Sequence, residues 1–85
     1  MRISEFEEAV WKVDRIRIVI RAPHGEAVQS FDWVKAADQG LRLSEYVKTR
    51  IEPRLNSFEF RIIDGTGEVP NGNTRVRNLR ESYTD

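Results

Sequence analysis

The sequence predicts an α+β fold, a two-layer sandwich in which helices cover one face of a mainly antiparallel sheet. Two segments, 14–23 and 58–63, alternate large apolar residues with charged ones, which is the pattern of a strand with one buried and one exposed face. Two others, 4–12 and 44–52, repeat apolar residues every three or four positions, as amphipathic helices do. The expected order is helix, strand, strand, helix, strand, with an extra C-terminal strand left open.

The length of 85 residues allows one hydrophobic core and therefore a single domain over residues 1–85. Residues 64–73 make up a turn-rich segment that contains one Asp-Gly and one Asn-Gly pair. Residues 74–85 make up a basic tail, which we expect to be either a short strand or a mobile segment.

The first helix is expected from about Ser4 to Lys12. Ser4 and Glu7 have the spacing of a capping box, in which the hydroxyl and the carboxylate bond free backbone amides at the helix start. Phe6 and Val10 then begin an apolar stripe at helical spacing. This stripe is predicted to pack on the sheet.

The first strand, 14–23, is the clearest element of the sequence. Ile16, Ile18 and Ile20 fall on its buried side, and Pro23 ends it because proline has no N–H to donate to a ladder. Its exposed side carries three arginines: Arg15, Arg17 and Arg21. A turn and a returning strand over 27–33 are expected to follow, which would make a hairpin.

The only histidine, His24, lies in the expected turn between these two strands. A catalytic histidine needs a positioned nucleophile and a group that orients the imidazole, and nothing nearby in the sequence completes such a set. We therefore expect His24 to be an exposed turn residue.

The central part of the chain is expected to be helical. Asp32 is placed to cap a short helix over 33–38, which Gly40 would end. A longer helix over 44–52 would start at Ser44 and stop before Pro53.

In the strand 58–63, Phe58, Phe60 and Ile62 are predicted to point inward, and Glu59 and Arg61 outward. A β-grasp-like topology is the alternative, because a hairpin, a helix, a strand and a turn-rich end follow in that order. The opening helix and the lack of a clear final strand favour the sandwich.

The composition argues against an enzyme. The chain has no cysteine, one isolated histidine and no glycine-rich nucleotide motif, since segment 64–73 lacks the P-loop ending. We therefore predict no catalytic residue, no cofactor and no metal site. The absence of cysteine fits a cytoplasmic location, and the apolar runs are too short to predict a membrane span.

The 14 basic residues are balanced by 14 acidic ones, and 11 of the basic residues are arginines. Arginine and aromatic residues are enriched at protein interfaces. The sequence therefore predicts a protein-interaction or regulatory module, of bacterial or mobile-element origin, that binds a larger protein complex. The expected partner-binding residues are Trp11, Arg15, Arg17, Arg21, Arg61, Arg75, Arg77 and Arg80.

Nucleic acid is the alternative partner, bound by an arginine-lined sheet face and the basic tail. Zero net charge, Glu59 on the same face and the absence of outward-facing aromatic residues there count against it. We therefore expect a protein partner.

Overall fold

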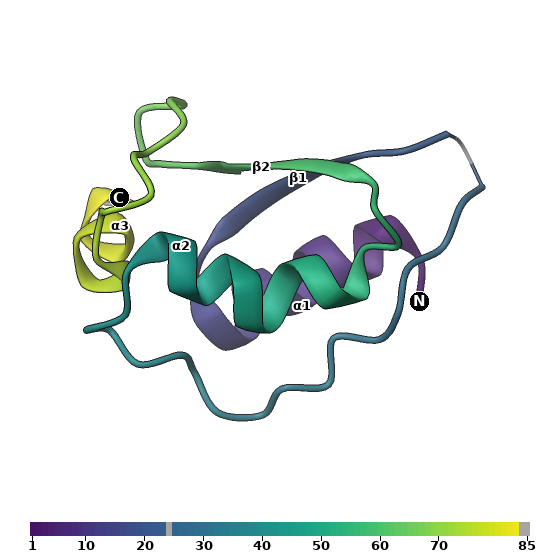
Figure 1. Ribbon diagram of the computed structural model, residues 1–85, viewed down its shortest axis with the longest axis horizontal. Coiled ribbons are helices and arrows are strands. Elements are labelled where there is room, and N and C mark those ends of the chain that lie inside the picture. Colours follow the sequence, from purple (N-terminus) through teal and green to yellow (C-terminus); the bar gives the residue numbers. More distant parts are fainter. Residues whose placement is uncertain (24, 84–85) are drawn as a thin grey trace.

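The computed structural model describes residues 1–23 and 25–83, which form a small α+β fold (Figure 1). The elements in this part of the chain are α1 (Ile3–Asp14), β1 (Arg17–Arg21), α2 (Leu43–Tyr46), β2 (Glu59–Ile63) and α3 (Val76–Ser82). After α2 the chain continues as a π-helical turn, η1 (Val47–Ile51), and a 3₁₀ turn, η2 (Glu52–Arg54). The α+β class predicted from the sequence is confirmed.

The sheet consists of β1 and β2, which pair antiparallel with Ile18 opposite Ile62 and Ile20 opposite Phe60. Along β1, buried Ile18 and Ile20 alternate with exposed residues, as the sequence predicts. The register therefore sends one row of side chains into the core and the other into solvent.

The core lies between the strands and the helices. In Figure 1 the two strands run along one side of the molecule and α1 and α2 along the other, with α3 at one end. Phe6 and Val10 of α1 and Tyr46 of α2 are fully buried there, and Phe6 meets the ring of Phe31 edge-on, with 5.3 Å between centroids.

The returning strand expected over 27–33 does not form. The strand-like pairing of this segment within the described residues is a single bridge between Ala27 and Arg2, the residue before α1, and its Val28 and Phe31 are buried in the core. Its backbone amides are bonded outside the sheet. The Val28 N–H donates to the Met1 carbonyl at 2.9 Å. The partner of β1 is β2, and the described elements run α-β-α-β-α.

The expected hairpin and the β-grasp-like alternative are therefore wrong, because the sheet of the described residues has two strands. The competing pattern explains why. Segment 58–63 has the cleaner alternation and covers Ile18 and Ile20 with matching apolar residues, whereas 27–33 mixes polar and apolar residues on both sides.

The short helix expected over 33–38 is also absent, because tertiary partners take up its backbone groups. The Ala37 N–H donates to Asp14 Oδ1 at 2.8 Å, and the Lys35 carbonyl accepts from Arg50 at 2.9 Å. A helix over 33–38 would turn the Ala37 N–H toward the carbonyl four residues before it, so the bond to Asp14 would be lost.

The helix starts differ from the predicted caps. α1 begins after Arg2, whose N–H donates to Glu5 Oε1 at 3.0 Å, and Glu7 instead accepts from the Ile20 N–H of β1 at 2.9 Å. α2 likewise begins after Arg42 and not after Ser44. Both starts lie about two residues before the hydroxyl that the sequence pattern favoured.

The expected strand or mobile segment within the tail is a helix. Val76 and Leu79 lie three positions apart in α3 and are both buried, and the Val76 N–H donates to the Leu41 carbonyl at 2.8 Å. Two apolar residues at this spacing suit one helical face. The predictions for His24 and for residues 84–85 fall outside the described residues.

Gly65, in the turn after β2, packs directly against the end of α3. Its N–H donates to Ser82 Oγ at 2.9 Å, and a Cβ at this position would lie 1.7 Å from the Ser82 carbonyl oxygen. We expect Gly65→Ala to lower the free energy of unfolding by about 1–3 kcal/mol, measured by urea denaturation, because backbone must move to admit the methyl group.

Gly72→Ala is the matched control for Gly65→Ala. A Cβ on Gly72 would make ordinary contact with the Ser44 Cβ at 3.5 Å, so the same substitution should change stability little. Equal stability of the two variants would contradict the packing of Gly65 against α3.

Candidate functional site

The exposed side of the sheet carries the candidate site. We define the outer face as Arg17, Val19 and Arg21 of β1 together with Glu59 and Arg61 of β2, all of which are exposed. Val19 stands opposite Arg61 across the strands, and Arg21 stands opposite Glu59. The side chain of Val19 is an apolar centre, 43% exposed, among charged neighbours.

The arginines of the outer face are not neutralised within the fold. The ion pairs in the described part of the chain join Lys12 to Glu8, Arg50 to Asp14 and Arg54 to Asp32. None of them involves the outer face, where three arginines and one glutamate leave a net charge of +2 (3 − 1). These guanidinium groups are available to an acidic partner.

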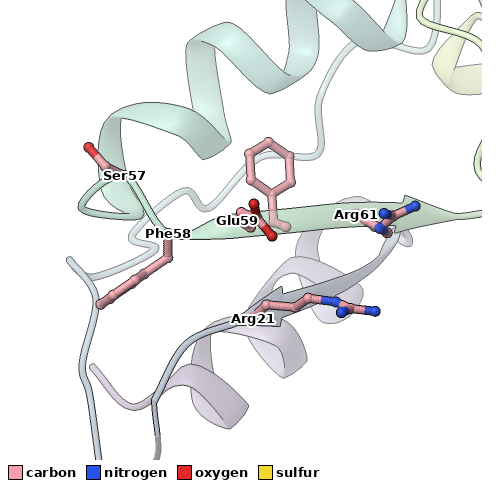
Figure 2. Close-up of a pocket in the computed structure, with 6 residues that line it drawn as sticks. Arg21, Ser57, Phe58, Glu59 and Arg61 are labelled. Carbon is pink, nitrogen blue, oxygen red and sulfur yellow. The ribbon is translucent and has the colours of Figure 1, made fainter.

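A shallow hollow of about 390 Å³ lies at one end of the outer face. It is lined by Arg21, Ser57, Phe58, Glu59, Phe60 and Arg61. Figure 2 shows the side chains of Arg21 and Arg61 extending from the two neighbouring strands, with Glu59 between Phe58 and Arg61 along β2. A carboxylate entering here would meet the guanidinium groups of Arg21 and Arg61, which outnumber the single carboxylate of Glu59.

The other end of the outer face adjoins a cluster that we call the aromatic corner: Trp11, Arg15, Arg17 and Tyr83. The Cζ of Arg17 lies 4.5 Å from the centroid of the Trp11 ring, and that of Arg15 lies 5.5 Å from it. Tyr83 meets Trp11 edge-on, with 5.4 Å between centroids. The fold thus brings together three of the predicted partner-binding residues, Trp11, Arg15 and Arg17.

Tyr83 links α3 to the end of the sheet. Its hydroxyl accepts from the Arg17 N–H at 3.1 Å and donates to the Ile63 carbonyl, so it bridges the last pair of β1 and β2. Burial raises the pKa of Tyr83, which keeps the hydroxyl protonated, although the hydrogen bond from Arg17 opposes that shift. The position of Arg17 is therefore set by both the aromatic ring stack and the strand end.

The three arginines predicted from the tail lie on or next to α3, away from the outer face. Arg80 donates from Nε to the Asp14 carbonyl at 2.8 Å and from Nη2 to the Ala37 carbonyl at 3.0 Å. Arg75 donates to the Gly40 carbonyl at 2.7 Å, and Arg77 is exposed. Two of these three side chains thus bond the backbone of residues 25–42, which we call the long segment because it connects the sheet to α2 without a helix or strand.

Asp14 is the polar residue that the sequence reading missed. Its side chain is fully buried, and its Oδ1 accepts from the Ala37 N–H at 2.8 Å and from Arg50 Nη1 at 2.9 Å. Its Oδ2 accepts from the Tyr46 hydroxyl at 2.7 Å. The Arg50 guanidinium also lies over the Trp33 ring, 4.2 Å from its centroid.

This buried cluster joins α1, the long segment and the α2–η1 helix. Burial raises the pKa of Tyr46, and the negative charge of Asp14 raises it further, so the phenol stays a neutral donor. With three donors on its carboxylate and no exposure, Asp14 is closed to a substrate. We read the cluster as structural.

The sequence contained a partial signal for this cluster. Tyr46 and Arg50 are four residues apart in a predicted helix and therefore share a face, but arginines on helices are mostly exposed, so this pair alone does not predict a buried cluster. Nothing in the spacing indicates that Asp14, 32 residues before Tyr46, would meet them.

Two further features, a metal-binding group and a membrane-spanning helix, are not found in residues 1–23 and 25–83. No three histidine, cysteine or carboxylate side chains there are grouped to hold a metal ion. Nor does any helix of these ranges combine the length and apolar character that a membrane span requires. No protein-family model matches the sequence, and no significant match was found among curated proteins or solved structures.

Proposed function

We propose that this chain is a non-enzymatic protein-binding module whose outer face binds an acidic segment of a protein partner, in a regulatory role on a larger complex. The observation that carries the proposal is the exposed Val19 surrounded by Arg17, Arg21 and Arg61, none of which has a carboxylate within 4.0 Å in the described residues. The proposal includes a two-layer sandwich, in which helices cover one face of the sheet and leave the outer face free for the partner.

The chemistry of the partner follows from this surface. Arginine guanidinium groups bind carboxylates in a bidentate manner. The exposed Val19 favours a partner that carries an apolar residue between its acidic residues, so that this residue can pack on Val19. Arg17 is held against Trp11 at 4.5 Å, so less side-chain entropy is lost when it binds. A segment that alternates acidic and apolar residues has the matching pattern.

Nucleic acid is less well supported as the partner. Proteins that bind single strands stack bases on open aromatic faces, whereas Trp11 is covered by Arg17 and packed against Tyr83. Glu59 on the outer face and zero net charge reduce the attraction for phosphates. These features favour a protein partner.

The proposal is tested with random peptides displayed against the full chain. We expect selection of acidic peptides, and we expect the double variant Arg17→Glu/Arg21→Glu to bind a selected peptide about tenfold or more weakly, because two charge-assisted contacts are lost. Fluorescence anisotropy measures the Kd.

The control is Lys35→Glu/Arg42→Glu, which changes net charge equally at two exposed positions outside the outer face and outside the predicted partner-binding residues. Equal weakening by both double variants would refute a specific surface. A single-stranded DNA probe is run in parallel, and tighter, steeply salt-dependent binding of DNA would favour the nucleic-acid alternative.

A further inference from the structure

Among the described residues, β2 pairs with β1 on one edge and with no strand on the other. The hydrogen bonds of β1 show which backbone groups of β2 lie on this second edge. The Ile20 N–H donates to Glu7 Oε2 at 2.9 Å and so points away from β2. In an antiparallel pair, residues opposite each other point the same way relative to the ladder, so the N–H and C=O of Phe60 point away from β1. The same alternation places the backbone N–H and C=O of Ile62 on this edge as well.

The two edges of the sheet are treated differently by the fold. Glu7 of α1 occupies the edge of β1, which is how proteins block an edge with a charged group. In the described residues no such group bonds the backbone of Phe60 or Ile62. A free edge of this kind is a template for another strand.

The free edge opens into an apolar groove of about 280 Å³ between β2 and the α2–η1 helix. Its apolar lining consists of Leu43, Val47, Phe60, Ile62, Val69 and Pro70, and Val69 is 56% exposed. A strand added to β2 would point alternate side chains into this groove. The groove is therefore complementary to a strand with apolar residues at every second position, and β2 itself has this pattern.

We propose that the occupant is a second copy of this chain, whose β2 pairs antiparallel with β2 about a two-fold axis at Phe60. In this register Phe60 faces Phe60 of the second copy as a hydrogen-bonded pair. Glu59 then faces Arg61 of the second copy, and Arg61 faces its Glu59, as non-hydrogen-bonded pairs in which side chains approach closely. One strand thus supplies both halves of two ion pairs.

Neighbouring registers lack this complementarity. An axis at Arg61 would set two arginines opposite each other, and an axis at Ile62 would set Arg61 against Ile63 and leave the charges unmatched. The axis at Phe60 is also compatible with the outward direction of its backbone groups. Charge pairing and backbone direction therefore select one register.

The resulting dimer has a four-stranded sheet whose two ends are β1 strands closed by Glu7. Pairing neutralises Glu59 and Arg61, and it leaves Arg17 and Arg21 of both copies as the charges of a doubled outer face. This inference goes beyond the proposed function. Arg61 belongs to both surfaces, but the two are tested separately, because the peptide assay changes Arg17 and Arg21 and the dimer assay changes Glu59 and Arg61.

Sedimentation velocity of the full chain from micromolar to millimolar concentration tests the dimer. We expect a reversible dimer for the natural sequence and about tenfold or greater weakening for Glu59→Arg and for Arg61→Glu, since each change sets like charges opposite each other twice. The double variant Glu59→Arg/Arg61→Glu restores opposite charges and should dimerise again. Circular dichroism confirms that each variant is folded.

Mixing the two single variants gives the sharpest test. Glu59→Arg carries two arginines on its edge and Arg61→Glu carries two glutamates, so the mixture should form a heterodimer although neither variant self-associates. A natural chain that stays monomeric to millimolar concentration would overturn the inference and leave the groove to a strand of another protein. So would a dimer that neither single substitution weakens.

Discussion

Replacing Asp14 with alanine is expected to lower the free energy of unfolding by about 3–5 kcal/mol, because it leaves the partly buried Arg50 charge without its counter-ion. The change also removes the acceptor for the Tyr46 hydroxyl and the Ala37 N–H, both of which are buried. Urea unfolding followed by tryptophan fluorescence measures the loss.

Asp32→Ala is the control for Asp14→Ala, because Asp32 also pairs with an arginine. Its side chain is 77% exposed and its contact with Arg54 spans 3.5 Å, so its removal should cost less than about 1 kcal/mol. Similar losses for Asp14→Ala and Asp32→Ala would show that burial of Asp14 does not decide its contribution.

Replacing Ile18 with alanine is expected to lower the free energy of unfolding by about 2–5 kcal/mol. Ile18 is 5% exposed, and its strand partner Ile62 is equally buried, so the truncation opens a cavity inside the core. The same denaturation experiment measures this loss.

Arg17→Ala is the matched change on the opposite side of the same strand. Arg17 is exposed, and its main contact is with the Trp11 ring at 4.5 Å, so its loss should cost at most about 1 kcal/mol. A larger loss for Arg17→Ala than for Ile18→Ala would mean that the strand has the inverted register.

The sequence was sufficient for the central residues of β1 and β2 and for the side of each strand that faces solvent. The expected start of the first strand at residue 14 was wrong, because α1 extends to Asp14 and Arg15 caps it in a left-handed conformation. In both segments large apolar residues recur at every second position, with Val19 and Ile63 as the apolar exceptions on the other side, and a strand can bury such a row in only one register. The prediction that Arg17, Arg21 and Arg61 share a face follows from that periodicity and the pairing of the two strands. Whether that face binds a partner stays a prediction.

The segments with mixed patterns were predicted less well. Segment 27–33 has strand-like composition but forms no strand, although its Val28 and Phe31 are buried. The tail contains α3, whose two buried residues, Val76 and Leu79, were too few for a periodicity argument. In both, contacts with distant residues decide the backbone. The Val76 N–H bond to Leu41 is one such contact.

Local alternation of side chains was thus determined by the sequence alone, since it depends on neighbours two to four positions apart. Tertiary structure alone decided the meeting of Asp14 with Tyr46 and Arg50, and the choice of β2 as the partner of β1. It also decided which sheet edge Glu7 closes. These outcomes depend on contacts between groups that are far apart in the chain. A buried donor or acceptor must be hydrogen-bonded, and only the tertiary structure determines which distant group is close enough to be its partner.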